Sequence, residues 1–378
     1  MLFGGCQKSV EVFSNFYGDS KMWKNTFSAE KAHEFKSSPV AVIIPHHLAA
    51  SDKLAMFYSG MSKVISPKRV FVIGPNHFEK GNGNIQTCKN CVYKTTLGGD
   101  LEVNKEAVAA LVKDGVANYF DEAFVEEHSI HSHSSYIKEY FKDAEIVPII
   151  LKWETPIEES EKLAKWLNEN LTEDDLLITS VDFSHYVSLE VANFHDQASK
   201  TTIENFDYNN IHDLELDSPA SVYTALKFAE LKGAMDVEQL DHSNLQDYMA
   251  THVAESTSHH FYAFYEGEKN PLKAVSIFAV GNLPNDNTLE FQNSWRWDYN
   301  YDEANDHTTE KQLKNLRGRE DRFLVGADFY MFDMPNNTCR TENQNEMKIV
   351  FCKYLEDSYE EGEFEAALES ADAQADLV

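Results

Sequence analysis

Short apolar runs alternate with longer amphipathic stretches between about residues 40 and 280, and this alternation constrains the fold most. The apolar runs are predicted strands: Val40–Pro45, Arg69–Gly74, Ile146–Leu151, Leu176–Val181, His260–Tyr265 and Ala274–Val280. The stretches between them carry apolar residues at helical spacing: Ala49–Val64, Lys105–Lys113, Pro156–Asn170, Leu189–Phe206 and Ala220–Leu231. Strands joined by helical crossovers form parallel sheets. The pattern therefore predicts an α/β fold with a mostly parallel central sheet and helices on both faces.

The composition changes at about residue 281, where Asn, Asp and aromatic residues begin to dominate. We therefore predict that the α/β domain covers residues 1–280 and that residues 281–355 form a C-terminal appendage. Residues 356–378 contain nine acidic residues and no Lys or Arg. Such a segment is predicted to be a solvated acidic tail.

Charge and cysteine content limit the partners and the compartment. Lys plus Arg is 33 and Asp plus Glu is 63, so the net charge is 33 − 63 = −30. Nucleic acid and anionic membrane surfaces would repel this chain. No stretch approaches the ~18–20 consecutive apolar residues of a membrane span. Five cysteines are an odd, sparse set, which favours the cytoplasm. The alternative is a lipoprotein anchored at Cys6, if an apolar segment once preceded it.

Three histidines directly follow predicted strands. They are His46, His77 and His185, and the carboxyl ends of parallel strands meet at one edge of a sheet, where ligands bind. A single such histidine is more often an ordinary buried residue with one hydrogen bond. Three converging imidazoles need a metal or an acid/base task to offset their desolvation. The sequence therefore predicts a functional site at this edge.

A fourth cluster of polar residues spans residues 126–133. Glu127 and His133 could reach inward from a helix start or a loop, and His128 and His133 are candidates for metal or substrate contact. Ser129 could cap the helix that follows, so part of this cluster could be plain capping chemistry. Both interpretations stay open at this point.

Several spaced motifs, taken together, resemble the Memo family, whose bacterial and archaeal branch is called AmmeMemoRadiSam system protein B. The motifs are Pro45-His46, Gly74-Pro75-Asn76-His77, Glu127-His128-Ser129-Ile130 with His133, and Ser180-Val181-Asp182-Phe183-Ser184-His185-Tyr186. Asn15-Phe16-Tyr17, Thr96-Leu97-Gly98-Gly99-Asp100 and Thr257-Ser258-His259 extend the resemblance over about residues 14–280. The resemblance implies the fold of the class III extradiol dioxygenases, whose members use non-haem ferrous iron.

Four site residues carry over from the family motifs: His46, His77, Asp182 and His185. The family cysteine does not, because this chain has Leu214-Glu215-Leu216-Asp217-Ser218-Pro219 in its place. Alignment on the proline puts Glu215 at the cysteine position, and Asp217 is the alternative in a shifted register. A further interpretation is that Glu215 is an exposed loop residue.

The loss of the cysteine changes the expected metal. Two histidines with a thiolate suit copper, whereas two imidazoles and a carboxylate form the facial triad that holds Fe(II). We therefore predict Fe(II) bound by His46, His77 and Glu215, with copper or zinc as alternatives. His185 is predicted as the general base, oriented by Asp182, in a dioxygenase-type reaction on a diol.

The resemblance also implies a ligand pocket and partners. His47, Asn76 and His259, together with His128 and His133, are predicted to contact a small-molecule or peptide ligand. The rival prediction is a non-catalytic metal- or peptide-binding protein that acts with a radical-SAM partner. Fold and metal triad support several reactions, so the substrate is not predicted.

Two features outside this site have simpler interpretations. Cys88 and Cys91 form a C-x-x-C pair, interpreted as a redox or incidental pair, because only Cys339 and Cys352 could complete a zinc site. The run Glu320–Phe329 looks distantly like part of a CapA-like domain. The metal-binding Gly-Asp start of such a domain is absent, since Gly281-Asn282 stands near its place. We therefore expect a degenerate structural fragment.

Overall fold

A computed structural model describes most of the chain as two compact units. The described residues are 9–13, 26–27, 32–95, 99–186, 189–208, 211–251 and 256–269, with the backbone of strands at 275–282, 297–298, 322–325, 338–344 and 347–355. The first unit comprises residues 1–183, 206–251 and 258–270, and the second comprises residues 184–205, 252–257 and 271–378. The predicted acidic tail 356–378, Cys6 and the motif at 15–17 lie outside the described residues.

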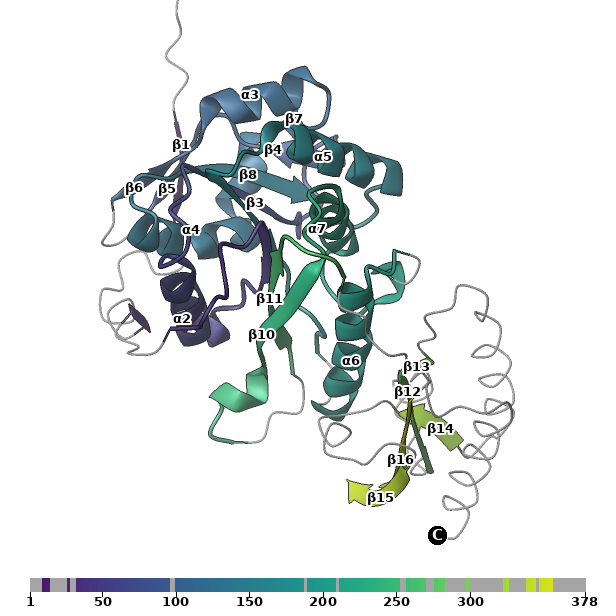
Figure 1. Cartoon of the computed structure of the whole chain (residues 1–378). Helices are drawn as coiled ribbons and strands as arrows, with labels where there is room; N and C mark the ends of the chain where they lie inside the picture. Colours follow the sequence, from purple (N-terminus) through teal and green to yellow (C-terminus); the bar gives the residue numbers. More distant parts are fainter. Residues whose placement is uncertain are drawn as a thin grey trace, which may run out of the picture. The chain divides into compact units, whose positions relative to one another are not determined.

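The first unit is built on an eight-stranded sheet (Figure 1). Its order is β10 (Asp236–Asn244), β11 (Ser258–Tyr265), β2 (Ala41–Ile44), β9 (Asp175–Ser180), β3 (Arg69–Pro75), β8 (Glu145–Leu151), β4 (Ile85–Thr87) and β7 (Asn118–Tyr119). The four central strands β2, β9, β3 and β8 are parallel, whereas β11 and β4 run antiparallel to their inner neighbours. The predicted α/β class with a mostly parallel sheet is confirmed.

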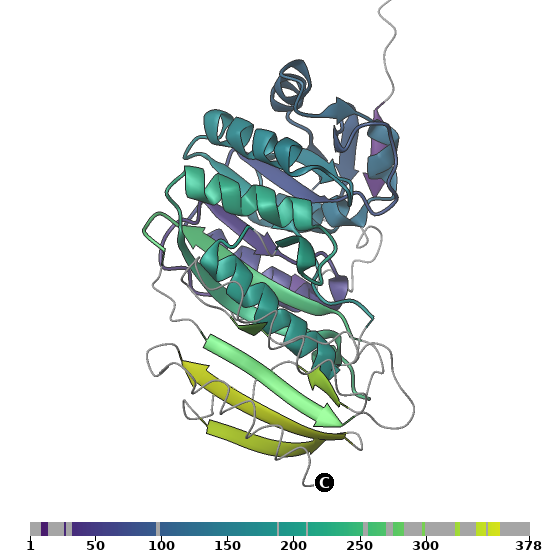
Figure 2. The ribbon, with the colours of Figure 1, turned by 90° about the vertical axis from the view of Figure 1, so that its right-hand side faces the viewer.

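Helices cover both faces of this sheet. Helices α2 (Ser51–Met61) and α4 (His128–Tyr140) pack together on one face, and α5 (Ile157–Asn170) and α7 (Pro219–Leu231) on the other. Figure 2 looks onto the face that α5 and α7 cover. Helix α3 (Lys105–Lys113) packs against β7 and β8. Strands β2 and β9 are buried along their whole length, as expected for strands covered on both faces.

Capping residues explain where two helices begin. The Ser218 side chain accepts the N–H of Ser221 and Pro219 occupies the first turn of α7, which is a favoured start for a helix. The Glu127 carboxylate accepts the N–H of Ser129 at the start of α4. No apolar periodicity predicted α4, because its buried residues include the polar run from His131 to Ser135.

Shorter elements complete the first unit. A second sheet contains β1 (Val10–Phe13), β5 (Cys91–Lys94) and β6 (Asp100–Glu102). Four 3-10 helices are η1 (Leu48–Ala50), η2 (Asp121–Val125), η3 (Ile211–Asp213) and η4 (Leu245–Tyr248). A disulfide joins Cys88 and Cys91 between β4 and β5, so this pair is not half of a zinc site here. The cytoplasmic location stays a prediction.

The second unit contains α6 (Leu189–Asn205) and a five-stranded sheet. Its strands are β12 (Val275–Asn282), β13 (Trp297–Asp298), β14 (Arg322–Val325), β15 (Thr338–Gln344) and β16 (Met347–Leu355). The predicted strand 274–280 therefore exists, but β12 pairs with β13, β14 and β16 and not with the central sheet. Cys339 and Cys352 are opposite residues of β15 and β16. The division at residue 280 stays a prediction.

The described residues contain no helix long and apolar enough to cross a membrane.

Candidate metal site

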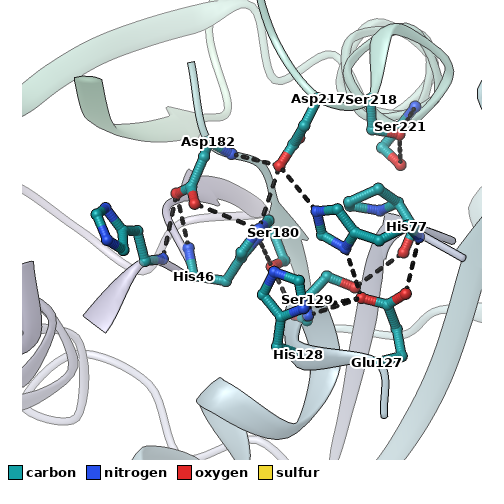
Figure 3. Close-up of polar contacts among 12 residues, drawn as sticks. His46, His77, Glu127, His128, Ser129, Ser180, Asp182, Asp217, Ser218 and Ser221 are labelled. Carbon is teal, nitrogen blue, oxygen red and sulfur yellow. Dashed lines mark hydrogen bonds and ion pairs between the residues drawn. The ribbon is translucent and has the colours of Figure 1, made fainter. Parts of the chain in front are cut away.

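Three parallel strands bring predicted site residues to one edge of the central sheet. His46 follows β2, His77 follows β3 and Asp182 follows β9 (Figure 3). The imidazole rings of His46 and His77 lie 5.1 Å apart between centroids. The carboxyl ends of parallel strands form the usual ligand-binding edge of such sheets, and His46, His77 and Asp182 lie together there.

The carboxylate between the two histidines comes from Asp217. Its Oδ2 lies 3.1 Å from Nε2 of His46 and 3.6 Å from Nε2 of His77, and it accepts the N–H of Asp182 at 3.2 Å. Glu215, the preferred prediction, is exposed, whereas its neighbours Leu214 and Leu216 are buried. Among the described residues Glu215 belongs to no group of converging ligand atoms. The carboxylate at this edge is therefore that of Asp217, which was the alternative prediction to Glu215.

His46 is held in place from two sides. Its ring is buried, with 1% of the side chain exposed, and its Nδ1 lies 3.0 Å from the Ser180 hydroxyl. Asp182 accepts the backbone N–H of His46 through Oδ1 at 3.0 Å, while its Oδ2 lies 3.3 Å from Nε2. The Nε2 atom therefore faces Asp182 and Asp217 together.

His77 is held by Glu127. Oε1 of this carboxylate accepts a hydrogen bond from Nδ1 of His77 at 2.7 Å, and Oε2 accepts the backbone N–H of His77 at 2.8 Å. Glu127 is fully buried, and its Oε1 also accepts the N–H of Ser129 at 3.0 Å. A carboxylate on the second ring nitrogen is a common way of orienting a metal-binding histidine. Nε2 of His77 is left facing Asp217.

Burial and the carboxylates act in opposite directions on the pKa of each histidine. Burial lowers the pKa of His46, but Asp182 and Asp217 outweigh it and the net pKa is raised. Burial likewise lowers the pKa of His77, and hydrogen bonds to Asp217 and Glu127 raise it to about 10. Burial raises the pKa of Glu127, but His77 and Ser129 bring it below its ordinary value. The site thus stabilises positive charge, which a metal ion would supply in place of protons.

His128 forms the outer side of the site. Its ring stacks on that of His77 with centroids 4.1 Å apart, and 41% of its side chain is exposed, against 24% for His77 and 1% for His46. Burial and then the neighbouring His46 and His77 lower the pKa of His128 to about 4. A neutral imidazole therefore lies where a ligand arriving from solvent would first reach the cluster.

Four of the residues that were predicted to contact a ligand form hydrogen bonds with other groups of the protein. Nδ1 of His47 lies 3.0 Å from Nε2 of His259, and the Asn76 side chain bonds to the backbone of Lys80. His133 is fully buried, with its two ring nitrogens 3.0 Å from the hydroxyls of Tyr58 and Ser180. These contacts give all four residues structural partners. Their role in ligand binding stays a prediction.

His185 and Asp182 are separated by the division into units. His185 belongs to the second unit and is partly exposed, so its role as general base stays a prediction. Asp182 was predicted to orient it, but the Asp182 carboxylate bonds to the backbone N–H groups of His46 and His47, at 3.0 and 3.3 Å. Ser180, which contacts His46, was not among the predicted site residues, although it begins one of the family motifs and is a polar residue at the end of an apolar strand.

The donor set fits a divalent metal. Ligand atoms of His46, His77 and His128 lie within 4.8 Å of one another, and so do those of His46, Asp182 and Asp217. Imidazole nitrogens and carboxylate oxygens are ligands for iron, zinc and other transition metals. With both Nδ1 atoms bonded to Ser180 and Glu127, the two Nε2 atoms are positioned as ligands.

Comparisons with known proteins identify the family of this chain. The sequence profile described as Memo-like protein matches residues 19–248. A MEMO1 family protein of Caldivirga maquilingensis is 27% identical over 64% of this chain and 88% of that protein, and one of Aquifex aeolicus is 24% identical over 56% and 81%. An uncharacterized protein of Escherichia coli K12, JW3007, has a solved structure similar at a TM-score of 0.40 and 11% identity, over 59% of this chain and 98% of that one. The matched profile covers more than half of the chain, which therefore belongs to the Memo family.

Proposed function

We propose that this protein binds one divalent metal through Nε2 of His46, Nε2 of His77 and the Asp217 carboxylate, and that it oxidises a small diol with dioxygen. One observation carries the proposal: both Nε2 atoms approach the same Asp217 oxygen, at 3.1 and 3.6 Å. Two imidazoles and one carboxylate make the facial triad of non-haem Fe(II) oxygenases, which leaves positions open for other ligands. When bound, ferrous iron would supply redox chemistry with dioxygen.

The residues around the triad have separate tasks. Asp182 holds the backbone of His46 and His47 and thereby fixes the chain at the end of β2. His128, neutral at pH 7 because its pKa is about 4, can accept a hydrogen bond from a hydroxyl of the diol. Its exposed ring places that acceptor on the open side of the site.

The first experiment measures metal content by elemental analysis after anaerobic purification. We expect near-stoichiometric iron in the wild type and its loss in His46→Ala and Asp217→Asn. The matched control is Glu215→Gln, an exposed carboxylate two residues away, which should keep its iron. Stoichiometric iron in Asp217→Asn, or its loss in Glu215→Gln, would overturn the assignment of the ligands.

A second experiment separates catalysis from metal binding. Oxygen consumption is measured with a panel of catechols and other vicinal diols, using the iron-loaded protein and Asp217→Asn. We expect consumption that depends on the diol and on Asp217. Full iron occupancy without oxygen consumption would favour the rival, a non-catalytic metal-binding protein.

A further inference from the structure

A chain of hydrogen-bonded side chains leads from His46 into the interior of the first unit. The Tyr58 hydroxyl lies 3.0 Å from Nδ1 of His133, whose Nε2 lies 3.0 Å from the Ser180 hydroxyl. The Ser180 hydroxyl also lies 3.0 Å from Nδ1 of His46 and donates to the Ser129 carbonyl at 2.6 Å (Figure 3). Tyr58, His133 and Ser180 are completely buried. Polar groups in such a position are costly unless all of them are paired.

The directions of these hydrogen bonds can be worked out from Ser180. Its hydroxyl has one hydrogen, and the carbonyl of Ser129 can only accept, so that hydrogen is used there. The two lone pairs of the hydroxyl must then accept hydrogen bonds from its other partners. Nδ1 of His46 and Nε2 of His133 therefore both carry protons.

The remaining link follows from the charge of His133. Burial lowers its pKa to about 3, so the ring is neutral and has one donor and one acceptor nitrogen. With the proton on Nε2, Nδ1 accepts from the Tyr58 hydroxyl, whose own pKa burial raises well above its ordinary value. Every donor in the chain then meets an acceptor.

We propose that Tyr58, His133 and Ser180 are positioning residues that keep the proton of His46 on Nδ1 and so present Nε2 as a metal ligand. Among the described residues the chain ends at Tyr58, which is buried and packs against Tyr136 with ring centroids 5.3 Å apart. Orientation of His46 is the task that this geometry supports. The consequence for metal binding rests on the proposed function, whereas the protonation pattern does not.

The protonation pattern is tested first, in the metal-free full-length protein. Two-bond ¹H–¹⁵N correlation spectra of ¹⁵N-histidine-labelled protein at pH 7 report which nitrogen of His133 is protonated, and a His133→Gln sample assigns the signal. We expect the proton on Nε2. A proton on Nδ1 would overturn the proposal, whether or not the protein binds a metal.

Metal affinity is tested second, by competition for Co²⁺ between each variant and a chelator. Ser180→Ala should bind about 10–100-fold more weakly, as is usual when a histidine ligand loses its orienting partner. Its control is Ser132→Ala, which removes a buried hydroxyl without a hydrogen-bond partner among the described residues. Wild-type affinity in Ser180→Ala would overturn the proposal.

A second pair of variants tests the proposal independently, in case Ser180→Ala fails to fold. Tyr58→Phe removes the last donor and should weaken Co²⁺ binding about threefold. Tyr136→Phe removes the hydroxyl of the adjacent buried tyrosine, which donates to the Ser51 carbonyl at 3.0 Å and is not a member of the chain, and should leave affinity unchanged. Equal losses in both variants would show a general packing effect and overturn the proposal.

Discussion

Two pairs of histidines in the first unit have pKa values that shift in opposite directions. At the sheet edge the pKa of His46 is raised and that of His77 reaches about 10. Along α4, burial lowers the pKa of His131 to about 4 and that of His133 to about 3. Burial lowers the pKa in all four cases. Only at His46 and His77 do the carboxylates Asp182, Asp217 and Glu127 outweigh burial and reverse the shift.

The difference assigns separate tasks to the two regions. Histidines beside carboxylates hold a positive charge, and a metal can take the place of that charge. A neutral histidine keeps one donor and one acceptor nitrogen, as the position of His133 between Tyr58 and Ser180 requires. The groups that contact an imidazole, more than the burial of its ring, therefore determine its protonation state and its function.

Among the variants that separate these two pairs of histidines, the largest effect is expected from removing the partner of His77. Glu127→Gln keeps the size of the side chain but replaces the buried carboxylate that accepts from Nδ1 of His77. Metal affinity should fall about 10–100-fold. In metal-free protein the pKa of His77 should fall from about 10 toward its ordinary value, as an NMR titration would measure.

The control for this variant is Glu126→Gln, because Glu126 is exposed and pairs only with Lys80 among the described residues. It should match the wild type in both measurements. An unchanged pKa of His77 in Glu127→Gln would contradict this explanation. A group other than Glu127 would then stabilise the charged form of His77.

Much of the edge region was predictable from the sequence. Apolar runs that end in polar residues placed His46 and His77 at the ends of parallel strands, because strand direction fixes where each run ends, and the family motifs added Asp182. The choice between Glu215 and Asp217 was not predictable. Those residues lie in an irregular segment, anchored by a bridge between Phe183 and Leu216 that only the tertiary structure creates.

The α4 region was harder to predict for a physical reason. Helix prediction depends on an apolar stripe, and the buried residues of α4 include an uninterrupted Ser and His run from His131 to Ser135. Hydrogen bonds between Ser180, His133 and Tyr58 join residues far apart in the sequence. No local pattern indicates such contacts.

An effect of intermediate size is expected on the pH dependence of the free energy of unfolding, through His131 on α4. The unfolded chain protonates His131 near pH 6.5, whereas the folded protein does so only near its lowered pKa of about 4, so stability is lost as the pH falls through this window. Between pH 7 and pH 5 the wild type should lose about 2 kcal/mol more free energy of unfolding than His131→Gln. Urea denaturation at both pH values measures this difference. Equal losses would mean that His131 is already charged in the folded protein.

The smallest expected effect concerns Asp182. Asp182→Asn keeps an oxygen for the backbone N–H groups of His46 and His47 but removes a charge 3.3 Å from Nε2 of His46. Metal affinity should fall roughly fivefold, because neutral acceptors bond more weakly than charged ones. A loss as large as that of Asp217→Asn, measured by the same competition assay, would make Asp182 a ligand in its own right.

The most direct test of the metal site is anomalous X-ray diffraction from crystals grown anaerobically with Fe²⁺. We expect one strong iron peak within bonding distance of Nε2 of His46, Nε2 of His77 and an Asp217 oxygen, with Glu215 remote from it. An iron peak bound by His128 without Asp217, or no peak at saturating Fe²⁺, would contradict this assignment.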